Sequence, residues 1–352
     1  MITKTVKCPN CKNQVTIQGN PREKIYVTCP KCNTRGEFTY PEETFFEKSN
    51  ESYLIEVKNL TKFYNGFKAV DNLAFNIKQG EIFGFLGPNG AGKTTTIRAM
   101  LGLINYSGQI KINGLDIKTN EKETKKYIGY LPERVAFYNN LTALQNLRFY
   151  SEIKNISTEE SLHFLEEFGL SESMHMKVGK FSKGMVQKLG FIRAINGNPT
   201  ILILDEPTAG LDAQSVVLVR EKLRELNNRR GITIFISSHV LSEIQQVCDR
   251  VGIINKGVLV AQDTISELSK KLQIKPRIII TVKQISNAII EAVKSIKGVD
   301  KIETTKNTME IMCNPETRSQ IIVEIEKAGG KIINLQTKEP SLEEVFISYT
   351  EG

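Results

Sequence analysis

The sequence lacks a hydrophobic run long enough to cross a membrane. No apolar stretch among its 352 residues approaches the roughly 18 residues that a membrane-spanning helix needs. The first residues are polar and a Cys-Pro-x-Cys turn begins at Cys8, so the N-terminus also lacks the features of a signal peptide. These two absences predict a cytoplasmic chain, and any work at a membrane would then require another chain.

Cysteine is scarce, and the six cysteines of a cytoplasmic protein are expected to be metal ligands or free thiols rather than disulfides. Four of them form two Cys-Pro-x-Cys knuckles, Cys8 with Cys11 and Cys29 with Cys32. The C-x₂-C-x₁₇-C-x₂-C spacing predicts a zinc ribbon, because two thiolates from each knuckle complete a tetrahedron. A redox Cys-x-x-Cys is the alternative, but no βαβ pattern surrounds the knuckles. The remaining two are interpreted as ordinary core or surface thiols: Cys248 and Cys313.

Positive charge exceeds negative charge, with a formal net charge of +8. This excess suits a nucleic acid, an anionic membrane surface or a phosphate-rich ligand, and does not choose among them. The predicted ribbon is itself basic, so its role stays open between nucleic acid, an anionic membrane face, protein docking and a passive appendage. Its cationic residues are Lys4, Lys7, Lys12, Arg22, Lys24, Lys31 and Arg35.

Buried strands alternate with helical patterns through the middle of the chain. Apart from Glu81 and Thr233, the runs Glu81–Leu86, Ile201–Leu204 and Ile232–Ile236 are continuously apolar, as strands buried in a parallel sheet are. A helical pattern such as Ala143–Glu152 lies between them. This alternation predicts an α/β fold whose sheet carries helices on both faces.

The C-terminal part has a different pattern. From about Ile274 the order of apolar segments predicts β-α-β-β-α-β, which is the split arrangement of ferredoxin-like domains. A last helix then begins near Pro340, with Ser341 as its N-cap. The predicted organisation is a zinc ribbon over 1–40, a polar linker over 41–52, an α/β domain over 53–272 and a ferredoxin-like accessory domain over 273–352.

A phosphate-binding loop follows the first buried strand. The nine residues from Gly87 to Thr95 fit the pattern G-x-x-x-x-G-K-T between a strand and a helix. Glycines let backbone N–H groups close around phosphates, and the helix N-terminus adds its positive dipole end. Lys93 is expected to bridge the β- and γ-phosphates, and the Thr94 hydroxyl to reach Mg²⁺. The predicted loop is Gly87, Pro88, Asn89, Gly90, Ala91, Gly92, Lys93, Thr94 and Thr95.

Two acidic residues follow the strand Ile201–Leu204. Asp205 is placed at the strand end beside the phosphate loop, where it is expected to hold Mg²⁺ through water. Glu206 comes next and is the predicted general base for the attacking water. Alone, such a pair would be interpreted as a solvated surface; the phosphate loop upstream favours catalysis.

Further motifs in a fixed order resemble those of ABC ATPases. Phe181–Met185 lies where that family has its Leu-Ser-Gly-Gly-Gln signature; Ser182 and Gly184 match, whereas Lys183 and Met185 depart. The resemblance implies a RecA-like core sheet, an antiparallel β subdomain and a helical signature subdomain. It also implies two subunits that sandwich two ATP molecules, each ATP lying between the phosphate loop of one chain and the signature of the other.

The resemblance assigns roles to four more residues. Tyr64 matches the aromatic residue that stacks on adenine, and Asp212 matches the loop that contacts the other subunit. His239 ends a buried strand and matches the switch histidine at the γ-phosphate. Glu133 stands where most members have glutamine, and its carboxylate can still reach Mg²⁺ or water.

Two segments resemble ABC subunits of the drug, antibiotic and sodium exporter group. They are Tyr130–Glu133, which reads Tyr-Leu-Pro-Glu, and Pro340–Phe346, which reads Pro-Ser-Leu-Glu-Glu-Val-Phe. In the family the region after Glu133 receives a helix of the membrane subunit, so Val135–Tyr150 is expected either to dock a permease or to pack as an ordinary helix.

The sequence therefore predicts an ATP-hydrolysing subunit, with ATP, Mg²⁺ and Zn²⁺ as its cofactors. It would power a separate membrane permease for export, from the cytoplasmic face of the membrane, as a homodimer or heterodimer. The alternative is a soluble ABC ATPase that acts on nucleic acid or a ribosome through its ribbon. That class usually has two cassettes in one chain, and this chain has one. A non-hydrolysing ATP sensor is disfavoured because Glu206 and His239 are both present.

Overall fold

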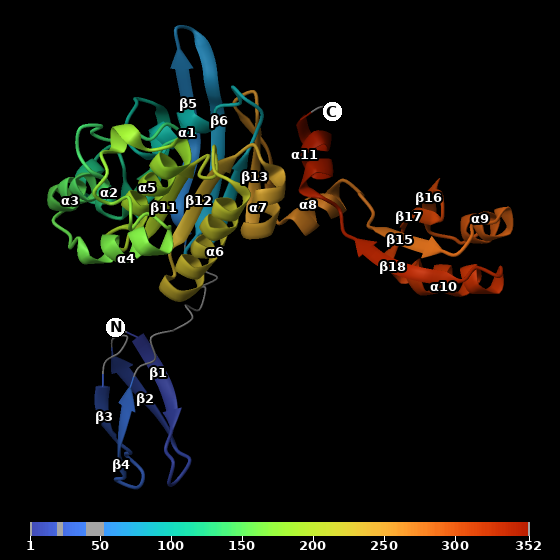
Figure 1. Cartoon of the computed structure of the whole chain (residues 1–352), viewed down its shortest axis with the longest axis horizontal. Coiled ribbons are helices and arrows are strands. Elements are labelled where there is room, and N and C mark those ends of the chain that lie inside the picture. The colour runs from blue at the N-terminus through green and yellow to red at the C-terminus, as the bar shows by residue number, and fades with distance from the viewer. Residues whose placement is uncertain (1, 20–23, 40–52, 351–352) are drawn as a thin grey trace.

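The computed structural model describes residues 2–19, 24–39 and 53–350 of the chain (Figure 1). The predicted linker 41–52 lies outside these residues. No helix in the described ranges is both long and apolar enough to pass through a bilayer.

The N-terminal part consists of two β-hairpins. Strand β1 (Ile2–Lys7) pairs with β2 (Gln14–Gly19), and β3 (Lys24–Thr28) pairs with β4 (Arg35–Thr39), both antiparallel. The two turns repeat one geometry. The first cysteine of each knuckle donates its N–H to a carbonyl five residues on: Cys8 to Asn13 at 2.8 Å and Cys29 to Thr34 at 2.9 Å.

A six-stranded sheet forms the centre of the molecule. Its order is β10-β11-β12-β7-β13-β14; the first five strands run parallel and β14 is antiparallel at the edge. This confirms the buried parallel strands predicted from the apolar runs. The strands are β7 (Ile82–Leu86), β10 (Ile128–Leu131), β11 (Ile201–Asp205), β12 (Thr233–Ser238), β13 (Arg250–Asn255) and β14 (Val258–Asp263).

The central strands are buried on both faces, because alternate side chains contribute to two separate cores. Ile234 and Ile236 of β12 belong to a core shared with helices on one face. Phe235 of the same strand faces the other core, where it lies with Phe75, Phe83 and Phe85 at ring-centroid distances of 5.3 to 6.2 Å. The helices around the sheet are α1 (Lys93–Met100), α6 (Ala213–Arg230), α7 (Leu241–Val247) and α8 (Ile265–Lys271).

Two further units complete the cassette. An antiparallel sheet of order β6-β5-β8-β9 covers the Phe235 side of the central sheet. A helical unit lies to one side of the central sheet (Figure 1). The antiparallel strands are β5 (Tyr53–Tyr64), β6 (Phe67–Lys78), β8 (Ser107–Ile112) and β9 (Leu115–Asp116). The helices are α2 (Glu121–Lys126), α3 (Ala143–Lys154), α4 (Glu159–Glu167), the 3₁₀ turn η1 (Val178–Lys180) and α5 (Lys183–Ile195).

The C-terminal part has the predicted β-α-β-β-α-β order, and its antiparallel sheet has the strand order β16-β17-β15-β18. Helices α9 and α10 supply Ile289, Val293, Ile321 and Ile325 to the core beneath this sheet. The elements are β15 (Arg277–Val282), α9 (Asn287–Lys294), β16 (Val299–Thr305), β17 (Thr308–Cys313), η2 (Pro315–Thr317), α10 (Arg318–Lys327) and β18 (Ile332–Lys338).

The last helix, α11 (Leu342–Thr350), returns to the cassette and packs on α7 and α8. Ser341 caps it as predicted, accepting the Glu344 N–H at 3.2 Å. Leu342 and Val345 are fully buried in the core of the central sheet, and the Leu342 N–H donates to Gln245 of α7 at 3.0 Å. The final helix is therefore part of the ATPase core in space, although it follows the accessory sheet in sequence.

Leu342→Ala is expected to loosen α11 from the cassette. Truncating a buried leucine costs about 2–5 kcal/mol, so amide hydrogen exchange over 342–350 should accelerate strongly while that of β15 to β18 stays slow. Ile347→Ala on the same helix is the control, because Ile347 is 45% exposed. Equal exchange in the two variants would contradict the docking.

Candidate nucleotide-binding site

A pocket of about 380 Å³ opens at the carboxyl ends of β7, β11 and β12. It brings together residues that are up to 170 positions apart in the sequence. Loops that follow parallel strands meet at one sheet edge, which explains why these residues converge. The lining consists of Ala69, Asn89, Gly90, Ala91, Gly92, Lys93, Thr94, Thr95, Glu133, Asp205, Glu206, Ala209 and His239.

The phosphate loop requires glycine at two positions for different reasons. Gly92 has φ of +109°, which L-residues rarely adopt, and a Cβ there would lie 2.8 Å from the Ala69 carbonyl oxygen. At Gly87 a Cβ would lie 2.4 Å from the Ile254 carbonyl oxygen. Any side chain at either position would push the loop away from its neighbours, so both glycines fix the shape that encloses the phosphates.

Lys93 is held in the loop by backbone oxygens. Its Nζ donates to the Gly87 carbonyl at 2.7 Å and to the Pro88 carbonyl at 3.3 Å, and the residue is only 8% exposed. Burial lowers the pKa of Lys93, and the nearby Glu206 and Asp205 carboxylates oppose that decrease. The ammonium therefore points into a site that compensates its charge, where a phosphate can replace the carbonyl partners.

Asp205 and Thr94 place oxygen ligands side by side. Thr94 Oγ1 donates to Asp205 Oδ2 at 3.3 Å, and the Ser237 hydroxyl donates to the other carboxylate oxygen. Burial raises the pKa of Asp205, and the Glu133 and Glu206 charges raise it further, while the two hydroxyl bonds lower it. A hydroxyl and a carboxylate oxygen beside the phosphate loop are hard donors of the kind that Mg²⁺ prefers, so these residues fit that ion.

Glu206 sits on a constrained backbone directly after β11. Its φ is +51°, in the left-handed region that residues with a side chain seldom occupy. Its N–H donates to the Ser237 carbonyl at 3.0 Å. One carboxylate oxygen lies 2.8 Å from His239 Nδ1 and accepts the His239 N–H at 3.4 Å. The strand ends thus aim a carboxylate and an imidazole at the same point of the pocket.

Six residues with predicted roles in ATP binding or subunit contact are absent from this lining. Two of them, Gly87 and Pro88, belong to the phosphate loop and accept hydrogen bonds from Lys93. Ser182 is exposed and caps α5, accepting the Met185 N–H at 3.2 Å. Asp212 is exposed and caps α6 in the same way, accepting the Ser215 N–H at 2.9 Å. Tyr64 lies at the end of β5, with Lys62 Nζ 4.8 Å from its ring centroid. A Cβ on Gly184 would contact the Gly210 carbonyl oxygen at 3.5 Å, so the segments that begin α5 and α6 are neighbours.

Two residues that hydrogen-bond to the acidic segment Asp205–Pro207 were not among the predicted site residues. Ser237 holds Asp205, as described above, and Gln187 of α5 donates its side-chain amide to the Glu206 carbonyl at 3.2 Å and the Pro207 carbonyl at 3.1 Å. Gln187 is 6% exposed. Gln187 lies five residues after Ser182 on a buried side of α5, and no neighbouring residue indicates its partner 19 positions further on.

The four ribbon cysteines form a second cluster. Their sulfur atoms all lie within 4.8 Å of one another, with Cys8 and Cys32 at 3.6 Å and Cys11 and Cys29 at 3.6 Å. Zinc–sulfur bonds of about 2.3 Å place the thiolates of a tetrahedral site about 3.8 Å apart. The cluster therefore has the donor type and the spacing that a zinc ion requires.

Known protein families match most of the chain. Residues 70–209 match the family described as "ABC transporter", and residues 264–350 match the one described as "ATP-binding protein DrrA1-3-like, C-terminal domain". The bacitracin transport ATP-binding protein BcrA of Bacillus licheniformis is 48% identical over 62% of this chain and 72% of its own. The linearmycin resistance ATP-binding protein LnrL of Bacillus subtilis is 32% identical over 84% of this chain and 98% of its own.

Solved structures show the same cassette. An ATP-binding subunit of an ABC transporter matches 62% of this chain and 93% of its own, with a TM-score of 0.59 and 30% identity. A dimeric bacterial ABC transporter cassette matches 60% of this chain and 98% of its own, with a TM-score of 0.57 and 25% identity. With the phosphate loop, the acidic strand end and these matches together, the chain belongs to the family of ABC transporter ATP-binding proteins and contains its ATPase cassette.

Proposed function

We propose that this chain is the subunit whose ATP hydrolysis powers export through a separate membrane permease, at the cytoplasmic face of the membrane. The observation that carries the proposal is the single pocket in which the phosphate loop, Asp205, Glu206 and His239 meet. The direction is supported by relatives named for bacitracin transport and linearmycin resistance.

In this proposal the pocket residues divide the work of hydrolysis. Lys93 and the loop N–H groups bind the β- and γ-phosphates, and Thr94, Asp205 and Glu133 hold Mg²⁺ directly or through water. Mg²⁺ neutralises phosphate charge when it is bound. Glu206 takes a proton from water as the water oxygen bonds to the γ-phosphorus and the bond to the bridging oxygen breaks. His239 Nδ1 lies 2.8 Å from the Glu206 carboxylate and orients that carboxylate.

A second copy or a related subunit completes the site. Ser182 and Asp212 are exposed and outside the pocket of their own chain, so they are free to contact nucleotide or residues of a partner. We assign Ser182 and Gly184 to the ATP bound by the partner, Asp212 to the contact between subunits, and Tyr64 to the adenine. Release of the γ-phosphate would then reopen the dimer.

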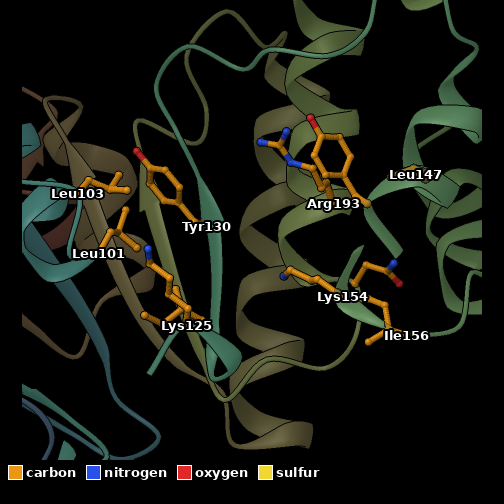
Figure 2. Close-up of a pocket in the computed structure, with 11 residues that line it drawn as sticks. Leu101, Leu103, Lys125, Tyr130, Leu147, Lys154, Ile156 and Arg193 are labelled. Atoms are coloured by element: carbon orange, nitrogen blue, oxygen red, sulfur yellow. The ribbon is translucent and has the colours of Figure 1, made fainter. Parts of the chain in front are cut away.

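The permease docks, in this proposal, in a second pocket of about 300 Å³ between the central sheet and the helical unit. Figure 2 shows Leu101, Leu103 and Tyr130 on one wall and Lys154 and Arg193 on the other. Tyr130 lies three residues before Glu133, which lines the nucleotide pocket, so one short segment contributes to both pockets. The lining is Leu101, Leu103, Lys125, Ile128, Tyr130, Leu147, Tyr150, Lys154, Ile156, Arg193 and Asn196.

The charge of this second pocket supports an occupant that carries an acidic group. Its three charged lining residues are all cations, and neither Lys154 nor Arg193 takes part in an ion pair with the described residues. Arg193 is fixed between the rings of Phe137 and Tyr150, 4.9 and 4.8 Å from their centroids. Partial desolvation by the protein atoms around it, and secondarily the Arg193 charge, lowers the pKa of Lys154, although the residue is exposed. An apolar permease segment with a carboxylate fits this surface by charge complementarity.

Affinity purification from detergent-solubilised membranes tests the partner. We expect a polytopic membrane protein to co-purify, and Lys154→Glu to reduce its recovery about tenfold or more, as loss of a close interfacial charge pair does. The control is Lys122→Glu, because Lys122 is exposed on the neighbouring α2 outside the pocket. Recovery of only ribosomes or nucleic acid would replace this proposal with a soluble ABC ATPase that is targeted by its ribbon.

We also propose that Cys8, Cys11, Cys29 and Cys32 bind Zn²⁺, and that the chain divides at the predicted positions into ribbon (1–40), linker (41–52), ATPase domain (53–272) and accessory domain (273–352). The sulfur spacing supports the metal. The separate hydrophobic core of the C-terminal sheet supports the last division.

A further inference from the structure

We propose that Gln187 is a positioning residue for hydrolysis, whose buried amide holds the Glu206 peptide in its catalytic orientation and connects it to helix α5. Two backbone carbonyls, those of Glu206 and Pro207, accept from this one amide at 3.2 and 3.1 Å. Gln187 is buried, so water does not compete for these bonds.

The Glu206 backbone needs such a restraint. Its φ of +51° costs an L-residue free energy and persists only where the surroundings enforce it. The N–H of Glu206 is held by the Ser237 carbonyl, and its carbonyl is held by Gln187. The peptide groups on either side of the Glu206 Cα are therefore fixed by separate elements, β12 and α5. The Glu206 carbonyl also accepts the Ala209 N–H at 3.2 Å, within its own turn. Without Gln187 this turn loses its bond to α5, and the backbone can relax and carry the carboxylate away from His239.

Helix α5 joins this restraint to two other features. It begins after Ser182, holds Gln187 in its second turn and carries Arg193 near its end. The 11 steps from Ser182 to Arg193 span about 16 Å of continuous helix. Helix α5 therefore connects the signature loop at its start with the cationic pocket of Figure 2 near its end, and it contacts the catalytic segment in between. This connecting role rests on the proposed permease and dimer. The positioning role of Gln187 rests on the proposed base Glu206 in the completed site and requires no permease.

Purified full-length chain carrying Gln187→Met tests the positioning role. Methionine matches the volume but cannot donate, so we expect kcat to fall about 100-fold, the penalty for roughly 1 Å of misplacement. The affinity for ATP, measured by equilibrium binding, should stay within about twofold, because the phosphate loop is untouched. If this variant does not fold, Gln187→Asn keeps the amide and shortens its reach, and the same split between kcat and affinity is expected.

Asn227 provides a matched control. Its buried amide also donates to two backbone carbonyls, those of Gly80 and Ile232, at 2.9 Å each, but it lies on α6 away from the nucleotide pocket. Asn227→Leu should lower the thermal stability about as much as Gln187→Met and leave kcat within about threefold. Equal kcat values in the two variants would overturn the positioning role. Failure of a permease to co-purify would instead refute the proposed function and leave this result standing.

Discussion

Replacing Glu206 by glutamine is expected to stop ATP hydrolysis while ATP remains bound. Glutamine keeps the shape of the side chain but cannot accept the proton of the attacking water. Loss of a general base lowers turnover by about 10²–10⁴-fold. The phosphate loop and Lys93 are unchanged, so ATP affinity should be preserved. If ATP holds two subunits together, the variant should also accumulate as a dimer in ATP, which light scattering after size exclusion would measure.

The outcome separates the general base from two alternatives. Wild-type turnover by Glu206→Gln would contradict its assignment as the base. Loss of both hydrolysis and ATP binding would show that the side chain supports the pocket instead. The control substitution is Glu316→Gln, an equal change at an exposed position far along the chain, for which no effect on turnover or dimer formation is expected.

The parts of the site that sequence could predict are local. Gly87–Thr95 is one continuous motif, and its strand–turn–helix context follows from the apolar run before it. The predicted β-α-β-β-α-β order is also found, and burial alternates along β15 (Arg277–Val282) because its sheet faces a core on one side only. The periodicity of apolar residues and the residue types of turns depend on neighbouring positions only, so these features can be predicted without knowledge of the rest of the fold.

The parts that could not be predicted depend on distant segments meeting in space. Nothing near Gln187 in sequence indicates that its amide meets the carbonyl of Glu206, 19 residues on. Leu342 bonds to Gln245, 97 residues earlier in the sequence. The terminal helix was predicted, but its sequence did not indicate which surface it would cover. The left-handed φ of Glu206 could not be predicted from the sequence either, because glutamate has no preference for that conformation. Tertiary packing decides all three.

Removal of zinc is expected to unfold the ribbon and leave the ATPase cassette folded. Among the ribbon side chains whose burial the structure describes, only Cys8 and Cys29 are buried, so no apolar core replaces the metal. A structural zinc site contributes about 10 kcal/mol or more to folding. The purified chain should contain one zinc per molecule. A chelator should bring amide exchange over residues 8–16 and 24–37 to the unfolded rate while β7, β11 and β12 stay protected.

Cysteine variants distinguish a metal site from a thiol pair. Cys11→Ser and Cys29→Ser each remove one ligand, one from each knuckle, and both should lose zinc and ribbon protection. The control is Cys248→Ser, since Cys248 lies beside the central sheet at Gly84 and should leave both unchanged. A redox pair would behave differently: the chain would lack zinc, and the ribbon would respond to reductant rather than chelator. Four sulfurs placed symmetrically by two identical turns favour the metal, because a disulfide would use only two of them.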